Sequence, residues 1–209
     1  MKQMTLIKLF TAAILSTTAI AAFPNVIHAK AVAVYGQTAD KLYYQYDPDV
    51  GEVSIIYYNG ANTSVTVPAY IEGMPVTSIT NSAFTPSREW LTSVTLPNTL
   101  KKIDSGSFYC CKLLESVNIP DSVTFIADSA FAECSSLTSV SIPASTTYIG
   151  TAAFSDCDNL LSVQILGPAE VDYHAFHNCE KLANVQLSDD SRTKPNCDYQ
   201  AFSNCPDLY

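Results

Sequence analysis

The sequence is short of positive charge and of long apolar runs, and each shortage excludes a class of function. It holds 11 Lys and Arg residues against 20 Asp and Glu residues, and the basic residues form no cluster. Binding to nucleic acid depends on basic groups that neutralise phosphates, so the composition excludes a nucleic-acid partner. Membrane-spanning helices need roughly 20 consecutive apolar residues. The sequence has no such run, so we expect no membrane span.

Catalytic motifs are also missing. The sequence contains no Gly-x-Ser-x-Gly elbow, no HExxH zinc motif and no phosphate-binding loop. His174 and His177 lie three residues apart near Cys179, a spacing that metal ligands can have. Both histidines flank the Phe of an ordinary repeat, so we interpret them as surface residues. A weak calcium site in the insertion at 188–199 stays an alternative. We therefore expect no enzyme activity, no cofactor and no metal site.

The N-terminus has the layout of a secretory signal peptide. Lys2 and Lys8 precede an apolar stretch at 9–22, and small-x-small patterns that suit cleavage lie between residues 19 and 33. We assign residues 1–31 to the signal peptide and leave the cleavage site open between 22 and 33. The remaining chain has eight basic and 20 acidic residues, a net charge of −12. We expect an exported protein that is secreted or associated with the cell surface.

Repeats dominate the rest of the sequence. Three segments between residues 91 and 159 align without a gap at a period of 23 residues. Segment 160–181 is one residue shorter, segment 182–209 carries an insertion before its Phe, and a looser copy lies at 63–84. A unit of this size cannot bury an apolar face alone, so successive units must stack into a solenoid.

Each repeat is predicted to form a short strand, a turn, a second short strand that ends in Ile, and a turn that carries Phe. In the first strand of one repeat, Val94 and Leu96 share one face, so Ser93 and Thr95 point to the other. The residue before the Phe is small in all six copies, because a larger side chain would push the Phe out of its stack. These small residues are Ala83, Ser107, Ala130, Ala153, Ala175 and Ala201.

The two ends of the repeat region differ. Residues 32–62 are predicted to form a β-hairpin cap, with strand-like runs at 42–46 and 53–58 around the turn residues 47–51. The solenoid then takes residues 63–209. No comparable polar cap follows the last repeat, so this C-terminal coil is either exposed or covered by something else. End-to-end self-association through the C-terminal coil is one way to cover it.

The recurring SVxIP strand, the following Ile and the AFxxC turn resemble the BspA-type leucine-rich repeats of bacterial surface and secreted proteins. The resemblance covers residues 42–209, and Leu166 and Ser188 depart from it by replacing the turn Pro. It implies a leucine-rich-repeat solenoid, a right-handed, strand-rich α/β-type superhelix of about six coils of about 23 residues. It also implies a binding scaffold for protein–protein interaction or adhesion, with a host or matrix protein as partner.

Seven cysteines in an exported chain ordinarily indicate disulfides. Here the repeat phase favours another arrangement, because five of them lie three residues after a repeat's Phe and occupy equivalent inward corners. Cys197 takes an inward Ile position, whereas Cys110 is out of phase. We expect a ladder of buried free thiols, with disulfides between adjacent coils as the alternative. The five equivalent residues are Cys111, Cys134, Cys157, Cys179 and Cys205.

The outward side chains of the first strands form an uncharged hydrogen-bonding face. Such a face either binds a protein partner or is a solvated ladder of small polar residues. On the second strands, Phe125 and Tyr148 stand at matching positions, where they are either exposed interface anchors or packed beneath a neighbouring turn. The predicted polar face comprises Ser93, Thr95, Ser116, Asn118, Ser139, Ser141, Ser162, Gln164, Asn184 and Gln186.

Two functions therefore remain open. The export signal, the repeats and the resemblance favour a secreted or cell-surface scaffold that binds another protein. The uncapped C-terminal coil favours a structural or self-associating module without an external ligand. The sequence does not name the partner, because surface residues of repeat proteins vary independently of the fold.

Overall fold

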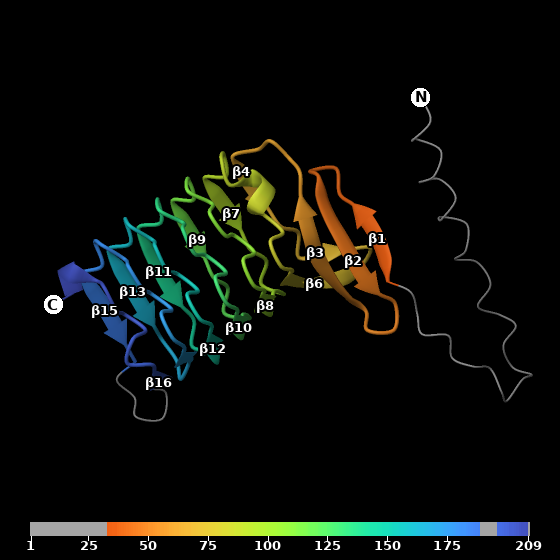
Figure 1. The fold of residues 1–209 in the computed structure, drawn as a ribbon. Helices are drawn as coiled ribbons and strands as arrows, with labels where there is room; N and C mark the ends of the chain where they lie inside the picture. Colours follow the sequence, from red (N-terminus) through yellow and green to blue (C-terminus); the bar gives the residue numbers. More distant parts are fainter. Residues whose placement is uncertain (1–32, 189–195, 209) are drawn as a thin grey trace, which may run out of the picture. The chain divides into compact units, whose positions relative to one another are not determined.

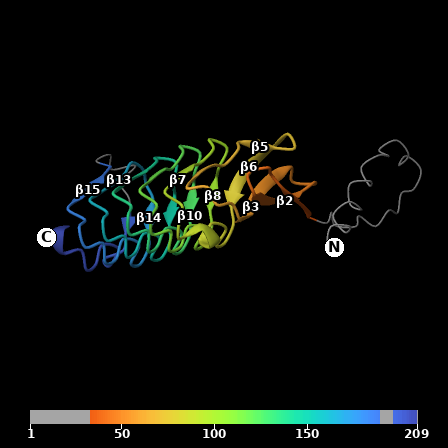
Figure 2. The same ribbon diagram turned by 90° about the horizontal axis from the view of Figure 1, so that it is seen from above.

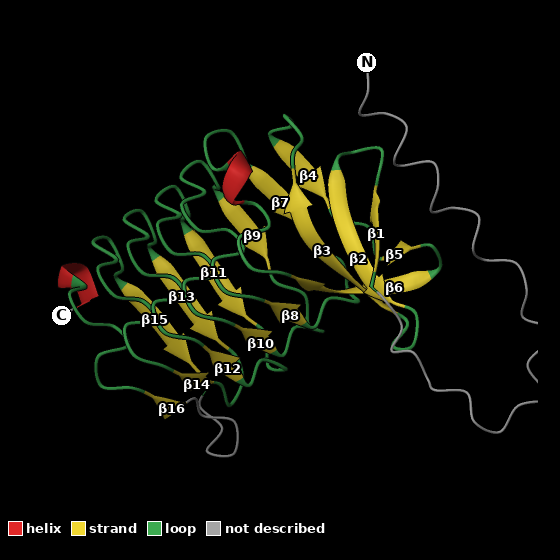
Figure 3. Ribbon diagram, turned by 45° about the vertical axis from the view of Figure 1, so that its right-hand side comes forward, coloured by secondary structure: helices red, strands yellow, loops and turns green. Residues whose placement is uncertain are grey.

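The computed structural model describes residues 33–188 and 196–208, so the predicted signal peptide lies outside the described residues. The described chain is a β-solenoid of about six turns, in which the first strands of the coils form one row and the second strands another (Figure 1). Seen from above, the coils follow one another as a flattened spiral (Figure 2). Helix in the described residues is limited to two 3-10 turns, Thr85–Ser87 and Pro206–Leu208, which are red in Figure 3.

The first strands pair in parallel and keep one register from coil to coil. Ser64 faces Ser93, and Ser93 faces Ser116, so each strand steps to the equivalent position of its neighbour. Hydrogen-bonded pairing stops between β9 and β11, which divides the row into two sheets. The first sheet contains β4 (Ser64–Thr66), β7 (Ser93–Thr95) and β9 (Ser116–Asn118). The second contains β11 (Ser139–Ile142), β13 (Ser162–Ile165) and β15 (Asn184–Leu187).

The second strands join the N-terminal strands in one ten-stranded sheet. From β3 onward the pairing along the sheet is parallel, and each inward Ile lies beside the Ile or Val of the next coil. The N-terminal strands are β1 (Val34–Gln37), β2 (Leu42–Asp47) and β3 (Glu52–Tyr58), followed by β5 (Tyr70–Ile71) and β6 (Met74–Ile79). The strands of the later coils are β8 (Lys102–Ile103), β10 (Phe125–Ile126), β12 (Tyr148–Ile149), β14 (Glu170–Val171) and β16 (Asn196–Cys197).

The N-terminal strands cover the first coil. β2 and β3 pair antiparallel, and β3 then pairs in parallel with β6 of the solenoid. The strand β1, which sequence reasoning did not identify, adds a third strand on the outer edge of β2. Tyr58 at the end of β3 is fully buried, and its ring lies 5.5 Å from the ring of Phe84. The backbone N–H of Tyr58 donates to the carbonyl of Ala83, so the cap closes both the ring column and the hydrogen bonds of the first coil.

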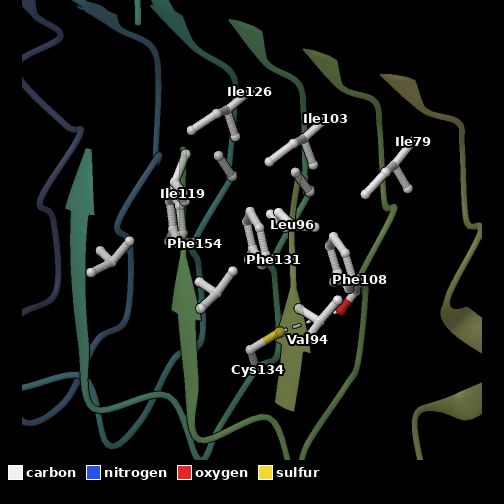
Figure 4. Packing of buried hydrophobic residues seen from close by; sticks show 14 of the residues in the cluster. Ile79, Val94, Leu96, Ile103, Phe108, Ile119, Ile126, Phe131, Cys134 and Phe154 are labelled. Atoms are coloured by element: carbon white, nitrogen blue, oxygen red, sulfur yellow. Dashed lines mark hydrogen bonds between the residues drawn. The ribbon is translucent and has the colours of Figure 1, made fainter. Parts of the chain in front are cut away.

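One Phe from each coil forms a continuous column through the core. Centroids of neighbouring rings are 4.7 to 5.1 Å apart from Phe84 to Phe202, and Figure 4 shows Phe108, Phe131 and Phe154 side by side. The small residue before each Phe has no solvent exposure, as predicted from the sequence. From Ser107 onward, its carbonyl accepts the N–H of the Phe in the preceding coil, at 2.7 Å from Phe131 to Ala153. A larger side chain there has no space between coils that lie this close.

The turn that carries the Phe contains two left-handed backbone positions in most coils, which the sequence did not indicate. They lie two residues before and two residues after the Phe, with φ between 55° and 61°. This conformation lets alternate N–H groups point along the stack: those of Ser129, Phe131 and Glu133 donate to carbonyls of the next coil at 2.7 to 3.0 Å. Left-handed backbone costs about 1–2 kcal/mol for a residue other than glycine. The hydrogen bonds between coils offset that cost.

Candidate interaction face

The predicted polar face lies on the outer side of the first strands. Alternation along each strand buries the Val and Ile side chains, with Val94, Val117, Val140 and Val163 all less than 9% exposed. The polar residues between them point outward and are exposed or half-buried. The structure nevertheless divides the ten predicted residues between the two sheets, because pairing stops between β9 and β11.

Six of the ten residues line one hollow on the second sheet. The hollow has a volume of about 290 Å³, and only Val140 and Val163 join the polar residues in its lining. No charged side chain lines it, so its recognition chemistry is hydrogen bonding by hydroxyl and amide groups. The other four predicted residues lie on the first sheet, outside this hollow. The six polar lining residues are Ser139, Ser141, Ser162, Gln164, Asn184 and Gln186.

Hydrogen bonds between neighbouring coils occupy some of the donors and acceptors of the polar face. Gln164 donates through Nε2 to Oε1 of Gln186 at 2.7 Å, and Ser93 donates through its hydroxyl to that of Ser64 at 2.8 Å. The solvated-ladder interpretation therefore applies to these pairs. An amide side chain has two N–H groups and an oxygen with two lone pairs, so one such bond leaves Gln164 and Gln186 able to bind further groups.

The predicted aromatic pair lies on the other sheet. Phe125 on β10 and Tyr148 on β12 stack with ring centroids 5.1 Å apart, and both are half-buried. The hydroxyl of Tyr148 donates to Oδ2 of Asp172 at 2.8 Å. This hydrogen bond is the main cause that raises the pKa of Tyr148 to about 12. The pair is therefore not part of the hollow, and the Tyr148 hydroxyl already has a partner.

The comparison with protein families identifies the repeat. The model of the BspA-type leucine-rich repeat region matches the chain with six copies, over residues 55–183 and 165–209. The chain belongs to this family. Leucine-rich repeat solenoids of this kind are generally non-enzymatic scaffolds, and the repeat suggests protein interaction. A comparison with curated proteins gave no match.

Solved bacterial structures share the fold. A leucine-rich repeat protein from Bacteroides ovatus is 31% identical, with a TM-score of 0.69 over 83% of this chain and 46% of that one. The T. pallidum leucine-rich repeat protein is 26% identical, with a TM-score of 0.59 over 72% of this chain and 82% of that one. A leucine-rich cell surface protein from Faecalibacterium prausnitzii, 22% identical, has a TM-score of 0.51 over 85% of this chain and 53% of that one. The chain spans less than half of the Bacteroides ovatus protein.

Five cysteines of the BspA-type repeats have a common structural role. Each of the five equivalent cysteines is buried, and its thiol lies 3.2 to 3.8 Å from the carbonyl oxygen of the Phe in the preceding coil. Figure 4 shows this contact between Cys134 and Phe108. Burial raises the pKa of Cys111 and of Cys157 to about 12, so both stay protonated donors. Cys110 and Cys197 are only half-buried.

The rings of the two histidines stack on each other. The rings of His174 and His177 lie 4.2 Å apart between centroids, and Nδ1 of His177 lies 2.9 Å from the hydroxyl of Ser203. Over residues 33–188 and 196–208, no group of three metal-binding side chains comes together. Most of the 188–199 insertion, where calcium was the alternative, lies outside the described residues. None of the helices in the described part of the chain has the length and apolarity to cross a bilayer.

Sequence reasoning missed two surface features. A hollow of about 370 Å³ lies where the cap meets the solenoid, and Lys101 there contacts Glu52 with 2.6 Å between Nζ and Oε1. That hydrogen bond lowers the pKa of the Glu52 carboxyl below its ordinary value. No motif links these residues in the sequence. Leu161 and Leu166, at the two ends of β13, are exposed. The sequence alignment of the repeats could have revealed these two leucines, because the three preceding repeats have Thr or Glu at the first position and Pro at the second.

Proposed function

We propose that the chain is a secreted or cell-surface scaffold, and that it binds a protein partner through the hollow on β11, β13 and β15. The observation that supports this most is the gathering of six uncharged polar side chains around one hollow of about 290 Å³. The parallel strands beneath them hold these side chains at fixed spacings, so little conformational entropy is lost on binding. Export rests on the signal-like N-terminus, and a host or matrix protein remains the proposed partner class.

The test measures saturable binding of the exported chain to immobilised collagen, fibronectin and laminin. Replacing Ser139 and Ser141 with Lys puts two charges into the hollow and should weaken binding at least tenfold. The matched control replaces Ser93 and Thr95 with Lys on the first sheet, and its binding should equal that of the wild type. Equal binding by both variants would show that the hollow is not the binding site. No saturable binding to any of the three proteins would reject a matrix partner.

A separate experiment tests whether the protein is exported to the medium or the cell surface. Antibodies against the chain should detect it in the culture medium or on intact bacteria, and the exported protein should begin between residues 23 and 34. A protein found only inside the cell, with Met1 still present, would contradict export.

Self-association is the second candidate function, and the last coil supports it. Val185, Leu187, Cys197 and Phe202 stand at core positions but are half-buried, whereas Val163, the equivalent of Val185 in the preceding coil, is 1% exposed. A second copy that covers the last coil would remove this apolar surface from water. Light scattering of the exported chain across concentrations measures the mass. A monomer throughout the micromolar range would reject this function.

A further inference from the structure

We propose that Leu161 and Leu166 are specificity-determining contacts at the two ends of the hollow, and that they select an extended, uncharged polypeptide segment with apolar side chains at both ends of a polar stretch. This inference rests on the proposed function, because it names the chemistry of a partner at the same face. It goes beyond that function in assigning two residues that do not belong to the polar face.

Both leucines are exposed and flank the central strand of the second sheet. Leu161 immediately precedes β13 and is 51% exposed, and Leu166 immediately follows it and is 45% exposed. Leu166 continues the outward phase of Ser162 and Gln164, two lining residues of the hollow. Five residues of extended chain separate the leucines, a distance of roughly 16 Å at about 3.3 Å per residue. The strand that crosses the hollow therefore has an exposed apolar residue just before its start and another just after its end, next to the lining residues but not among them.

The repeat itself does not require these leucines. At the position of Leu161 the three preceding coils have Thr92, Glu115 and Thr138, and at the position of Leu166 they have a turn Pro. The backbone bonds of both leucines do not depend on the side chain: the Leu161 N–H donates to Thr138 and the Leu166 N–H to Ile142, and the Ser188 N–H makes the equivalent bond in the last coil. Two departures from the repeat, both apolar and exposed, thus flank the one strand at the centre of the hollow.

The lining decides the class of partner. With no charged group in the hollow, a charged partner segment would lose hydration without gaining an ion pair. A segment of Ser, Thr, Asn or Gln type satisfies the hydroxyl and amide groups, and its flanking apolar residues cover Leu161 and Leu166. Burying the exposed half of one leucine favours binding by roughly fivefold to tenfold.

The experiment uses a displayed library of random 12-residue peptides and the exported chain. Sequences selected on the wild type should carry few charges and should have apolar residues flanking three to five polar ones. Binding should change less than twofold between 0.05 and 0.5 M salt, because screening acts on charges. Selection of predominantly charged peptides, or of no peptide, would overturn the inference.

Substitutions then test the two leucines, each of which is replaced by a residue that another repeat has at the equivalent position. Leu161→Thr and Leu166→Ser should each weaken binding of the selected peptides about fivefold to tenfold, with unchanged melting temperature. The control Leu113→Ser changes another exposed leucine, outside the hollow, to the residue found at the next repeat, Ser136, and should leave binding unchanged. If the Leu161→Thr, Leu166→Ser double variant binds like the wild type while the Ser139, Ser141 lysine variant loses binding, the inference fails and the proposed function stands. If no variant affects binding, both fail.

Discussion

Replacing Phe131 with Ala removes the central ring of the Phe column. The Phe131 side chain has no solvent exposure, and its ring has a neighbour 5.0 Å away on each side, Phe108 and Phe154. A buried Phe→Ala change typically costs 3–5 kcal/mol of unfolding free energy, and each ring pair adds about 0.5–1.5 kcal/mol. With two ring pairs, we therefore expect a loss of about 4–8 kcal/mol. This is a large part of the 5–15 kcal/mol that is usual for a folded domain.

The matched control is Phe202→Ala in the last coil. The Phe202 side chain is half-buried, and among the described rings its ring stacks only on Phe176. We expect its loss to be about 2 kcal/mol, half that of the central residue or less. Urea unfolding followed by circular dichroism gives both free energies. Equal losses, or a larger loss for Phe202→Ala, would refute the reasoning that the column is stabilised by contacts on both sides of each ring.

Three further results are expected. In native buffer a thiol reagent should react with no more than Cys110 and Cys197, and with all seven thiols after denaturation; six or seven fast thiols in the native protein would contradict the buried ladder. Folding raises the pKa of Tyr148 from its ordinary 10 to about 12, so its contribution to stability is present below pH 10 and is lost as the pH rises through 12. Tyr148→Phe should therefore reduce the fall in melting temperature over this pH window, and an unchanged fall would contradict the Asp172 hydrogen bond. Ala153→Leu should cost about 1–3 kcal/mol of unfolding free energy in a urea titration, because the site is fully buried. The control Ala183→Leu changes an exposed site and should cost nothing measurable. Equal effects would disprove the argument that the close spacing of the coils excludes a larger side chain before the Phe.

The sequence predicted those features that recur with the repeat. Strand alternation placed Val94 inward and Ser93 outward, and the structure agrees, because a strand has a fixed two-residue period. The phase of the cysteines relative to the Phe likewise predicted that Cys134 and its equivalents are buried free thiols. Both predictions needed only the spacing between residues and no knowledge of contacts between distant segments.

Features that break the repeat were beyond sequence reasoning. The strand β1 pairs with β2 outside the period, so no register indicated it. Left-handed backbone was missed because residues such as Ser129 and Glu133, not glycines, adopt it. The interruption of pairing between β9 and β11 was also missed, because their sequences, SVN and SVSI, keep the common pattern. The sequence therefore did not indicate that the residues of the predicted polar face belong to two hydrogen-bonded sheets.

The cap bears on the size of any assembly that forms through the Phe column. At the first coil, Tyr58 fills the place of a preceding Phe, and its N–H occupies the carbonyl of Ala83. At the last coil, the outer side of Phe202 has no equivalent ring among the described residues. The column is therefore already covered within the chain at its first coil, so another copy cannot stack on it there. Copies that meet through the last described coil do so symmetrically, and a symmetric contact of this kind closes at a dimer.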